Sequence, residues 1–203
     1  MSETFEMVAK TLYGLEEILA EELLALGAND LQIGRRMVSF TGDKELLYKA
    51  NFHCRTALRV LKPIYHFKAK DADTVYKEVK KVEWEKYLSL DKTFAIDSVI
   101  YSEVNHSKFV AYRTKDAIVD YFIEKFKKRP SVRVNNPDLY INIHISHNDC
   151  TLSIDSSGES LHKRGYRVDQ TEAPLNEVLA AGMILKTGWK GESNFVDPMC
   201  GSG

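Results

Sequence analysis

The sequence closes with residues whose types suit a tight turn against a bound ligand. Residues 194–196, Asn-Phe-Val, are predicted to form a short buried strand, which leads into Asp-Pro-Met-Cys-Gly-Ser-Gly at positions 197–203. In α/β nucleotide-binding sites an acid orients such a turn, and paired glycines let a ligand approach the backbone closely. A Gly-x-Gly alone more often marks a plain surface turn. It is the complete heptapeptide after a strand that indicates a ligand-binding turn. The candidate cofactor contacts are Asp197, Pro198, Cys200, Gly201, Ser202 and Gly203.

A second chemical signal is a local excess of positive charge. Residues 105–135 contain eight Lys or Arg against three acids, whereas residues 1–60 contain seven against nine. Clustered cations neutralise nucleic-acid phosphates, so the asymmetry favours the middle of the chain as a phosphate-binding region. The alternative is that the cations at 125–129 only complement a helix carboxyl end, worth about 0.3–1 kcal/mol. The candidate phosphate contacts are Lys108, Arg113, Lys127, Lys128, Arg129 and Arg133.

A basic, aromatic segment around residues 161–167 is a third candidate. Arg164 and Arg167 supply two guanidinium groups, and Tyr166 supplies a ring able to stack on a base. Single-stranded RNA is often recognised by this combination. The alternative interpretation is a solvated linker.

Histidine and cysteine give no metal site or nucleophile. His144 and His147 lie three apart on a predicted strand, so their side chains face opposite sides. Cys200 has no placed base beside it and is interpreted as a small packing residue. With Cys54 and Cys150 it makes three widely spaced cysteines, an odd and sparse usage that indicates reduced thiols and a cytoplasmic setting.

The composition is that of a globular protein. Of 203 residues, 44% are hydrophobic and 28% charged, and 28 Lys or Arg face 29 Asp or Glu, which excludes a global basic excess. The amino-terminal residues do not resemble a secretory signal. The longest apolar run, residues 178–185, has eight residues, whereas a membrane span needs about 20.

Three segments must position these residues. Residues 1–67 are predicted to form a ferredoxin-like α+β domain, with strands at 3–10, 31–40 and 57–67, a kink at Gly34, and helices at 15–26 and 43–52. Residues 68–157 are predicted to add a helix at 72–82, a strand at 94–101, a long helix at 108–128 and a hairpin over 139–154. Within the long helix we expect one apolar face, formed by Phe109, Ile118, Tyr121, Phe122 and Phe126.

Residues 158–203 begin a third segment. A helix is predicted over 174–187, with Pro174 in its first turn and Gly188 after its end. One helix and one strand have no partner layer to bury against, so we expect the segment to be the opening of a truncated domain.

The motifs resemble those of THUMP-containing class I S-adenosylmethionine-dependent RNA methyltransferases. The terminal heptapeptide resembles the first motif of such enzymes, and residues 162–167 with 173–185 resemble their lead-in segment. Residues 12–28 resemble the family's ferredoxin-like domain, and residues 94–98 with 115–120 its RNA-binding THUMP domain. The best resemblance is to bacterial large-subunit rRNA guanine-N2 methyltransferases, also labelled adenine-specific DNA methylases. It implies S-adenosylmethionine as cofactor, with the glycine turn facing its methionine and ribose, and RNA, preferably ribosomal, as partner.

One family motif is missing. The Asn/Asp-Pro-Pro-aromatic tetrapeptide that positions the target amino group does not occur in these 203 residues. The resemblance therefore implies that the chain as given cannot methylate, and that its catalytic residues lie beyond position 203. The alternatives are a tRNA methyltransferase, a DNA adenine-N6 methyltransferase, against which the THUMP-like segment argues, and a non-catalytic RNA-binding module.

Overall fold

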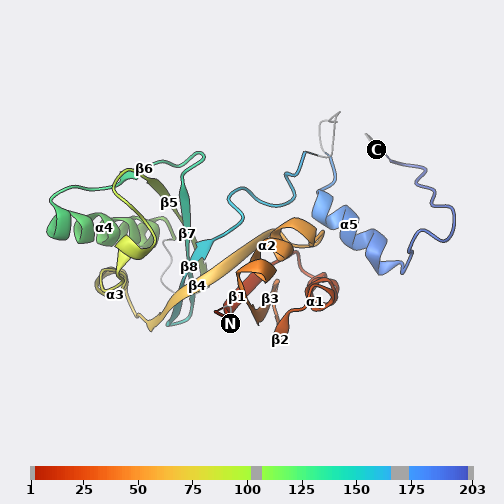
Figure 1. Ribbon diagram of the computed structural model, residues 1–203, viewed down its shortest axis with the longest axis horizontal. Coiled ribbons are helices and arrows are strands. Elements are labelled where there is room, and N and C mark those ends of the chain that lie inside the picture. Colours follow the sequence, from red (N-terminus) through yellow and green to blue (C-terminus); the bar gives the residue numbers. More distant parts are fainter. Residues whose placement is uncertain (1–2, 102–106, 166–173, 201–203) are drawn as a thin grey trace. The chain divides into compact units, whose positions relative to one another are not determined.

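A computed structural model describes residues 3–101, 107–165 and 174–200 of the chain (Figure 1). It has two compact units, one comprising Met1–Val60 with Glu159–Gly203 and the other Leu61–Gly158. The second unit is thus inserted, in sequence, between two parts of the first. In the described residues no helix is long and apolar enough to cross a membrane.

The first unit is a small antiparallel sheet covered by two helices. Strand β1 (Phe5–Lys10) pairs antiparallel with β3 (Met37–Gly42), which pairs antiparallel with β2 (Asn29–Gly34). Helices α1 (Glu16–Ala25) and α2 (Lys44–His53) pack on this sheet through one apolar core. The fully buried side chains of that core include Met7, Leu19, Leu23, Val38 and Phe40.

The ends of the two helices follow from local chemistry. Helix α1 stops at Gly27, whose φ of +94° is readily adopted only by glycine. Helix α2 begins after Asp43, whose carboxylate accepts the Leu46 backbone N–H at 2.9 Å. Both boundaries agree with the sequence prediction.

The predicted single strand over 31–40 is wrong. The structure has a hairpin there, β2 and β3, that turns at Arg35 and Arg36, with Gly34 paired to Met37. Arg36, the second residue of the turn, adopts a φ of +59°, a left-handed conformation that is uncommon for residues other than glycine. Its backbone N–H donates to Glu16 at 2.8 Å. Two arginines are not a typical turn sequence, which is why the prediction treated Gly34 as a kink.

The second unit is a mixed five-stranded sheet with helices packed against it. Its strand order is β4-β8-β7-β5-β6, with β5 parallel to both β7 and β6 and the other pairs antiparallel. The strands are β4 (Arg59–Lys68), β5 (Thr93–Tyr101), β6 (Ser131–Val132), β7 (Leu139–Ser146) and β8 (Asp149–Asp155). The helices are α3 (Ala72–Val79), the 3-10 turn η1 (Trp84–Lys86) and α4 (Ser107–Phe126). The predicted hairpin is confirmed, and its turn residue His147 has a φ of +55°.

The buried face of α4 differs in part from the prediction. Ile118 and Phe122 are buried in the core, but Phe109 is 53% exposed and Phe126 40% exposed. The side chain that turns inward is Val110, one position, or about 100° of helix, away from Phe109. The prediction followed the largest apolar residues, whereas the structure also packs small ones against the core.

The third segment returns to the first unit. Helix α5 (Glu177–Lys186) is capped by Asn176, whose Oδ1 accepts the Val178 N–H at 3.0 Å, so it begins after Pro174 rather than at it. A Cβ placed on Gly182 would lie 2.5 Å from the Leu15 methyl groups, which shows how closely α5 approaches the residue preceding α1. Gly188 follows with a φ of +74°.

The predicted buried strand at 194–196 is wrong. All three residues are exposed and belong to no strand. A strand needs a neighbour to satisfy its backbone N–H and C=O groups. No described strand pairs with this run, so its two apolar residues, Phe195 and Val196, do not by themselves make it a strand.

Candidate nucleic-acid interface and cofactor turn

The basic residues that follow α4 form one exposed stretch, which we call the α4 basic end. Helix α4 closes at Lys127, whose N–H donates to the Ile123 carbonyl oxygen at 2.9 Å and whose φ is +58°. The Arg133 N–H donates to the Phe94 carbonyl at 3.0 Å, which fixes the far end of the stretch beside the start of β5. The members of the α4 basic end are Lys127, Lys128, Arg129 and Arg133, all exposed.

The side chains of the α4 basic end are little used by the protein itself. Lys127 Nζ donates to the Glu124 carbonyl oxygen at 3.2 Å. None of the four cations forms an ion pair with a described acid. Their charge is therefore available to an external anion. It also complements the partial negative charge at the carboxyl end of α4, the alternative interpretation that the sequence left open.

Lys108 is exposed but lies at the opposite end of α4. The helix has 20 residues, and at a rise of about 1.5 Å per residue its two ends are roughly 30 Å apart. The structure therefore does not bring Lys108 into the α4 basic end.

Arg113 is held by its own chain. Its Nη2 lies 2.6 Å from Asp73 Oδ1 on α3, and its guanidinium carbon lies 4.5 Å from the Tyr76 ring centroid. The Tyr76 hydroxyl in turn donates to Asp120 at 2.7 Å. Arg113 thus connects α3 to α4, and its charge is already compensated.

Other cations near α4 are also paired. Lys125 and the Tyr121 hydroxyl both donate to Glu85 on η1, and these bonds lower the pKa of Glu85 to about 2. Lys115 pairs with the adjacent Asp116 at 2.9 Å. Glu85 and Asp73 both lie outside residues 105–135, so a charge count over that window overstates the positive charge exposed to solvent.

Arg164 has an internal role that the sequence did not indicate. Its Nη1 donates to the Phe52 carbonyl oxygen at 2.6 Å, its Nη2 to the Cys54 carbonyl at 2.7 Å, and its Nε to the Leu161 carbonyl at 3.0 Å. The last carbonyls of a helix have no partner within the helix. Arg164 therefore caps the carboxyl end of α2 from more than 100 residues away. The companion candidates Tyr166 and Arg167 lie outside the described residues.

The segment before Arg164 is also attached to the first unit. The Leu161 N–H donates to the Leu58 carbonyl oxygen at 2.8 Å, and Ser160 Oγ donates to the same carbonyl at 3.3 Å. The Leu161 side chain packs against the core of that unit. Residues 160–164 are thus a docked connection rather than a solvated linker.

The candidate cofactor turn is described only in part. Asp197 Oδ1 accepts the Met199 N–H at 2.9 Å, so the acid orders the turn that it begins. Pro198 and Cys200 are exposed. The remaining candidates, Gly201, Ser202 and Gly203, lie outside the described residues.

The buried cysteines are not nucleophiles. Burial raises the pKa of the Cys54 thiol to about 12 and that of Cys150 to about 11. Both thiols stay protonated near neutral pH, and a thiol is a weak nucleophile compared with its thiolate. No group of three metal-ligating side chains occurs in the part of the chain that the structure describes.

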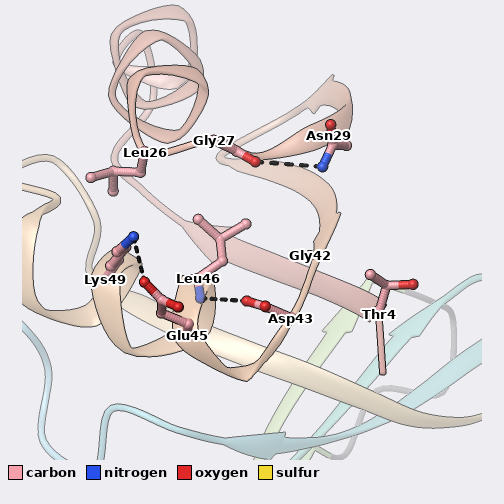
Figure 2. A pocket seen from close by; sticks show the side chains of 9 residues that line it. All are labelled: Thr4, Leu26, Gly27, Asn29, Gly42, Asp43, Glu45, Leu46 and Lys49. Carbon is pink, nitrogen blue, oxygen red and sulfur yellow. Dashed lines mark hydrogen bonds and ion pairs between the residues drawn. The ribbon is translucent and has the colours of Figure 1, made fainter. Parts of the chain in front are cut away.

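A hollow of about 250 Å³ lies between the end of α1 and the start of α2 (Figure 2). Four of its polar side chains, those of Asn29, Asp43, Glu45 and Lys49, already bind one another or the nearby backbone. Asp43 caps α2, Glu45 pairs with Lys49 at 2.7 Å, and Asn29 Nδ2 donates to the Gly27 carbonyl. The arrangement explains the local fold and leaves little polar capacity for a ligand.

Comparison with known families assigns a domain to each segment. Residues 6–61 match the RlmL ferredoxin-like domain, residues 69–155 the THUMP domain, and residues 164–203 the RMKL-like methyltransferase domain. The predicted fold class is thereby confirmed. In all three segments the chain is thus similar to the domain families that the sequence predicted, a ferredoxin-like domain, a THUMP domain and the start of a methyltransferase domain.

Individual relatives agree with this assignment. The chain is 46% identical over 196 residues to the ribosomal RNA large subunit methyltransferase K/L of Syntrophotalea carbinolica, covering 94% of this chain and 27% of that protein. It is 43% identical to the candidate RNA methyltransferase slr0064 of Synechocystis, covering 94% and 50%. A crystal structure of SMU.472, a candidate methyltransferase complexed with SAH, matches with a TM-score of 0.83 and 33% identity over 99% of this chain and 53% of that one. The chain thus spans half or less of the length of these two curated relatives.

Two exposed aromatic residues were not among the predicted site residues. Tyr48 and Phe52 lie on α2 with 63% and 75% of their surface exposed. The sequence could have indicated that both are exposed. Leu46 and Ala50 form the buried face of α2, and Tyr48 and Phe52 do not lie on that face.

Proposed function

We propose that the intact protein transfers a methyl group from S-adenosylmethionine to an RNA base, and that the domains described above hold the RNA. The observation that carries the proposal is the joint presence, in one chain, of a THUMP domain with an exposed basic stretch and a segment matching a methyltransferase domain. Neither feature alone separates an RNA-modifying enzyme from a binding module.

The proposed cofactor contacts are Asp197, Pro198, Cys200, Gly201, Ser202 and Gly203. The Asp197 carboxylate already organises the first bend of this segment, which suits a turn that a ligand approaches closely. When bound, S-adenosylmethionine would supply a methyl group on a sulfonium, which is a good leaving group. Positioning of the acceptor would then dominate catalysis, and a base in structured RNA would have to be flipped out to reach it.

Large-subunit ribosomal RNA is the proposed substrate, with the guanine N2 amino group as the proposed target. The support for the RNA class is the 46% identity to a large-subunit enzyme. The support for guanine N2 is that the terminal turn, residues 197–203, resembles the first motif of RNA-guanine methyltransferases. The rival substrates are tRNA and duplex DNA.

The α4 basic end is the proposed phosphate contact. Its four exposed cations lie within seven consecutive residues, close enough to follow one stretch of backbone. Each phosphate neutralised contributes roughly 0.7 to 0.9 to the slope of log affinity against log salt. This surface can therefore be tested through salt dependence as well as affinity.

The test is RNA binding by the 203-residue chain over a salt series, with rRNA fragments, tRNA and duplex DNA as competing ligands. We expect preference for rRNA, and we expect Lys127→Glu, Lys128→Glu and Arg129→Glu together to reduce the slope by roughly 2 to 3. A matched control reverses Lys70, Lys77 and Lys163, which are exposed cations elsewhere. Equal or absent binding to all three ligands would overturn the proposal, and preference for tRNA would reassign the substrate.

The chain as given is predicted to be inactive, because the tetrapeptide that would position the acceptor amine is not in its sequence. Incubation with labelled S-adenosylmethionine and rRNA should leave no label on the RNA. Label transfer above background would show that the acceptor is positioned by residues within this sequence.

A further inference from the structure

Helix α2 carries two aromatic rings on a side that no other described element covers. Tyr48 and Phe52 lie four positions apart, which places their Cβ atoms about 5–6 Å apart on the same face of the helix. They are 63% and 75% exposed. His53 packs edge-on against Phe52, with ring centroids 4.9 Å apart. The result is a row of ring surfaces along the last turns of the helix.

The rings border an open hollow with one cation, Lys44, beside it, because the lining Lys49 is already paired with Glu45 at 2.7 Å. The hollow has a volume of about 450 Å³ and is lined by Tyr48, Lys49, Asn51, Phe52 and His53. Lys44, one turn before Tyr48, places its ammonium 5.9 Å from the Tyr48 ring centroid. Ring faces next to positive charge match a nucleobase and its phosphate, because every base has a π-face and every nucleotide an anionic backbone.

The small extent of the surface argues against a protein partner. One helix supplies all five lining residues. A stable protein interface needs about 800 Å² from each partner, considerably more than two aromatic side chains of about 150–250 Å² each provide.

The backbone beneath Phe52 is held in place. Arg164 binds the carbonyl oxygens of Phe52 and Cys54 at 2.6 and 2.7 Å, so the end of α2 does not have to be ordered when a ligand arrives. Preorganised surfaces bind with less loss of conformational entropy. The same contact joins this helix end to the chain segment that continues towards the methyltransferase match.

We propose that the Tyr48–Phe52 face of α2 is a second RNA contact, which stacks on one or two unpaired bases. The inference rests on the proposed function, since it assumes that the ligand is RNA. It divides the recognition between two kinds of surface. The α4 basic end reads backbone charge, and α2 selects unpaired nucleotides.

The test compares two RNAs bound to the full 203-residue chain, one fully paired and one with the same stem and a short unpaired extension. We expect wild-type protein to bind the extended RNA more tightly. Phe52→Ala and Tyr48→Ala should each weaken that binding by roughly fivefold or more while leaving the paired RNA unaffected. Phe52→Trp should retain it, because a larger ring still stacks. Leu24→Ala, an equally exposed apolar position on α1, is the control.

The outcomes separate this inference from the proposed function. If the chain binds RNA, responds to charge reversal at the α4 basic end and ignores both α2 substitutions, the stacking face is wrong and the proposed function stands. If α2 substitutions change only self-association in sedimentation, the face is a protein contact and the inference is overturned. If no RNA binds at all, both fail. Circular dichroism checks that each variant is folded.

Discussion

Arg129, beyond α4, and Arg164, before α5, are both arginines in basic stretches, and the sequence predicts nucleic-acid contact for both. In the structure their surroundings are opposite. Arg164 donates to three carbonyl oxygens of its own chain, whereas Arg129 is exposed and forms no ion pair with a described residue. The same side chain is thus structural in one region and accessible in the other. A cation indicates a binding surface only after its internal partners are known.

The contrast has an energetic basis. Carbonyl groups at the end of a helix lose their water when a neighbouring segment covers them, and an unsatisfied one costs roughly 1–3 kcal/mol. A phosphate contact by the Arg164 guanidinium would have to replace its bonds to the carbonyls of Phe52, on α2, and Cys54, just after it. Arg129 would lose only solvent. The two arginines should therefore respond to substitution through different measurements.

The largest effect is expected for Arg164→Ala. It removes the cap of α2, and we expect the first unit to lose about 1.5–3 kcal/mol of unfolding free energy. The unfolding free energy of Arg164→Lys should lie between those of wild type and Arg164→Ala, because an ammonium cannot reproduce the forked pair of bonds. The measurement is the urea unfolding midpoint, with the exposed neighbour substitution Lys163→Ala as control. If the unfolding midpoint does not change and the slope of log RNA affinity against log salt falls by about one, Arg164 contacts RNA phosphate and does not cap α2.

A smaller effect is expected at Arg113, and it sharpens the comparison within α4. Arg113→Gln removes an ion pair to Asp73 and a cation–π contact with Tyr76, so we expect a loss of about 1 kcal/mol in stability. The RNA salt slope should not change. Arg129→Gln should do the opposite, with stability within about 0.5 kcal/mol of wild type and a slope smaller by roughly 0.7–0.9. A lower slope for Arg113→Gln would place it in the interface.

The sequence is a good guide to the fold where local rules decide the structure. The caps at Asp43 and Gly27 and the alternating hairpin over 139–154 depend on neighbouring residues only, and each lies where it is predicted. The Arg35–Arg36 turn was missed because its residues carry no turn signature. The exposed run at 194–196 was misread because strand formation depends on a partner that a local pattern does not reveal.

The candidate site was less predictable because its residues depend on distant partners. Asp73 and Glu85 pair with cations of α4 but lie outside residues 105–135, over which the charge was counted. Arg164 binds the end of α2 although more than 100 positions separate them in sequence. No count over consecutive residues includes such pairs. The exposure of the α4 basic end agrees with the sequence reasoning, because its four cations have no acidic partner among the described residues. Its role as a phosphate contact stays a prediction.

The smallest effect is expected for the pH dependence of stability at Glu85. It tests whether Glu85 neutralises the charge of Lys125 on α4 electrostatically. Hydrogen bonds from Lys125 and Tyr121 lower the pKa of Glu85 from 4.5 to about 2. A carboxylate with a depressed folded-state pKa contributes stability that is complete above its unfolded pKa and is lost as pH falls through the folded value. The melting temperature of wild type should therefore exceed that of Glu85→Gln by a constant amount above pH 5, and the gap should narrow between pH 4.5 and 2. In a Lys125→Met background the difference in melting temperature should change less with pH, because the Lys125 hydrogen bond to Glu85 is gone. A gap that stays constant down to pH 2 would mean that Glu85 acts through packing, and that the cations of α4 are less compensated than their geometry indicates.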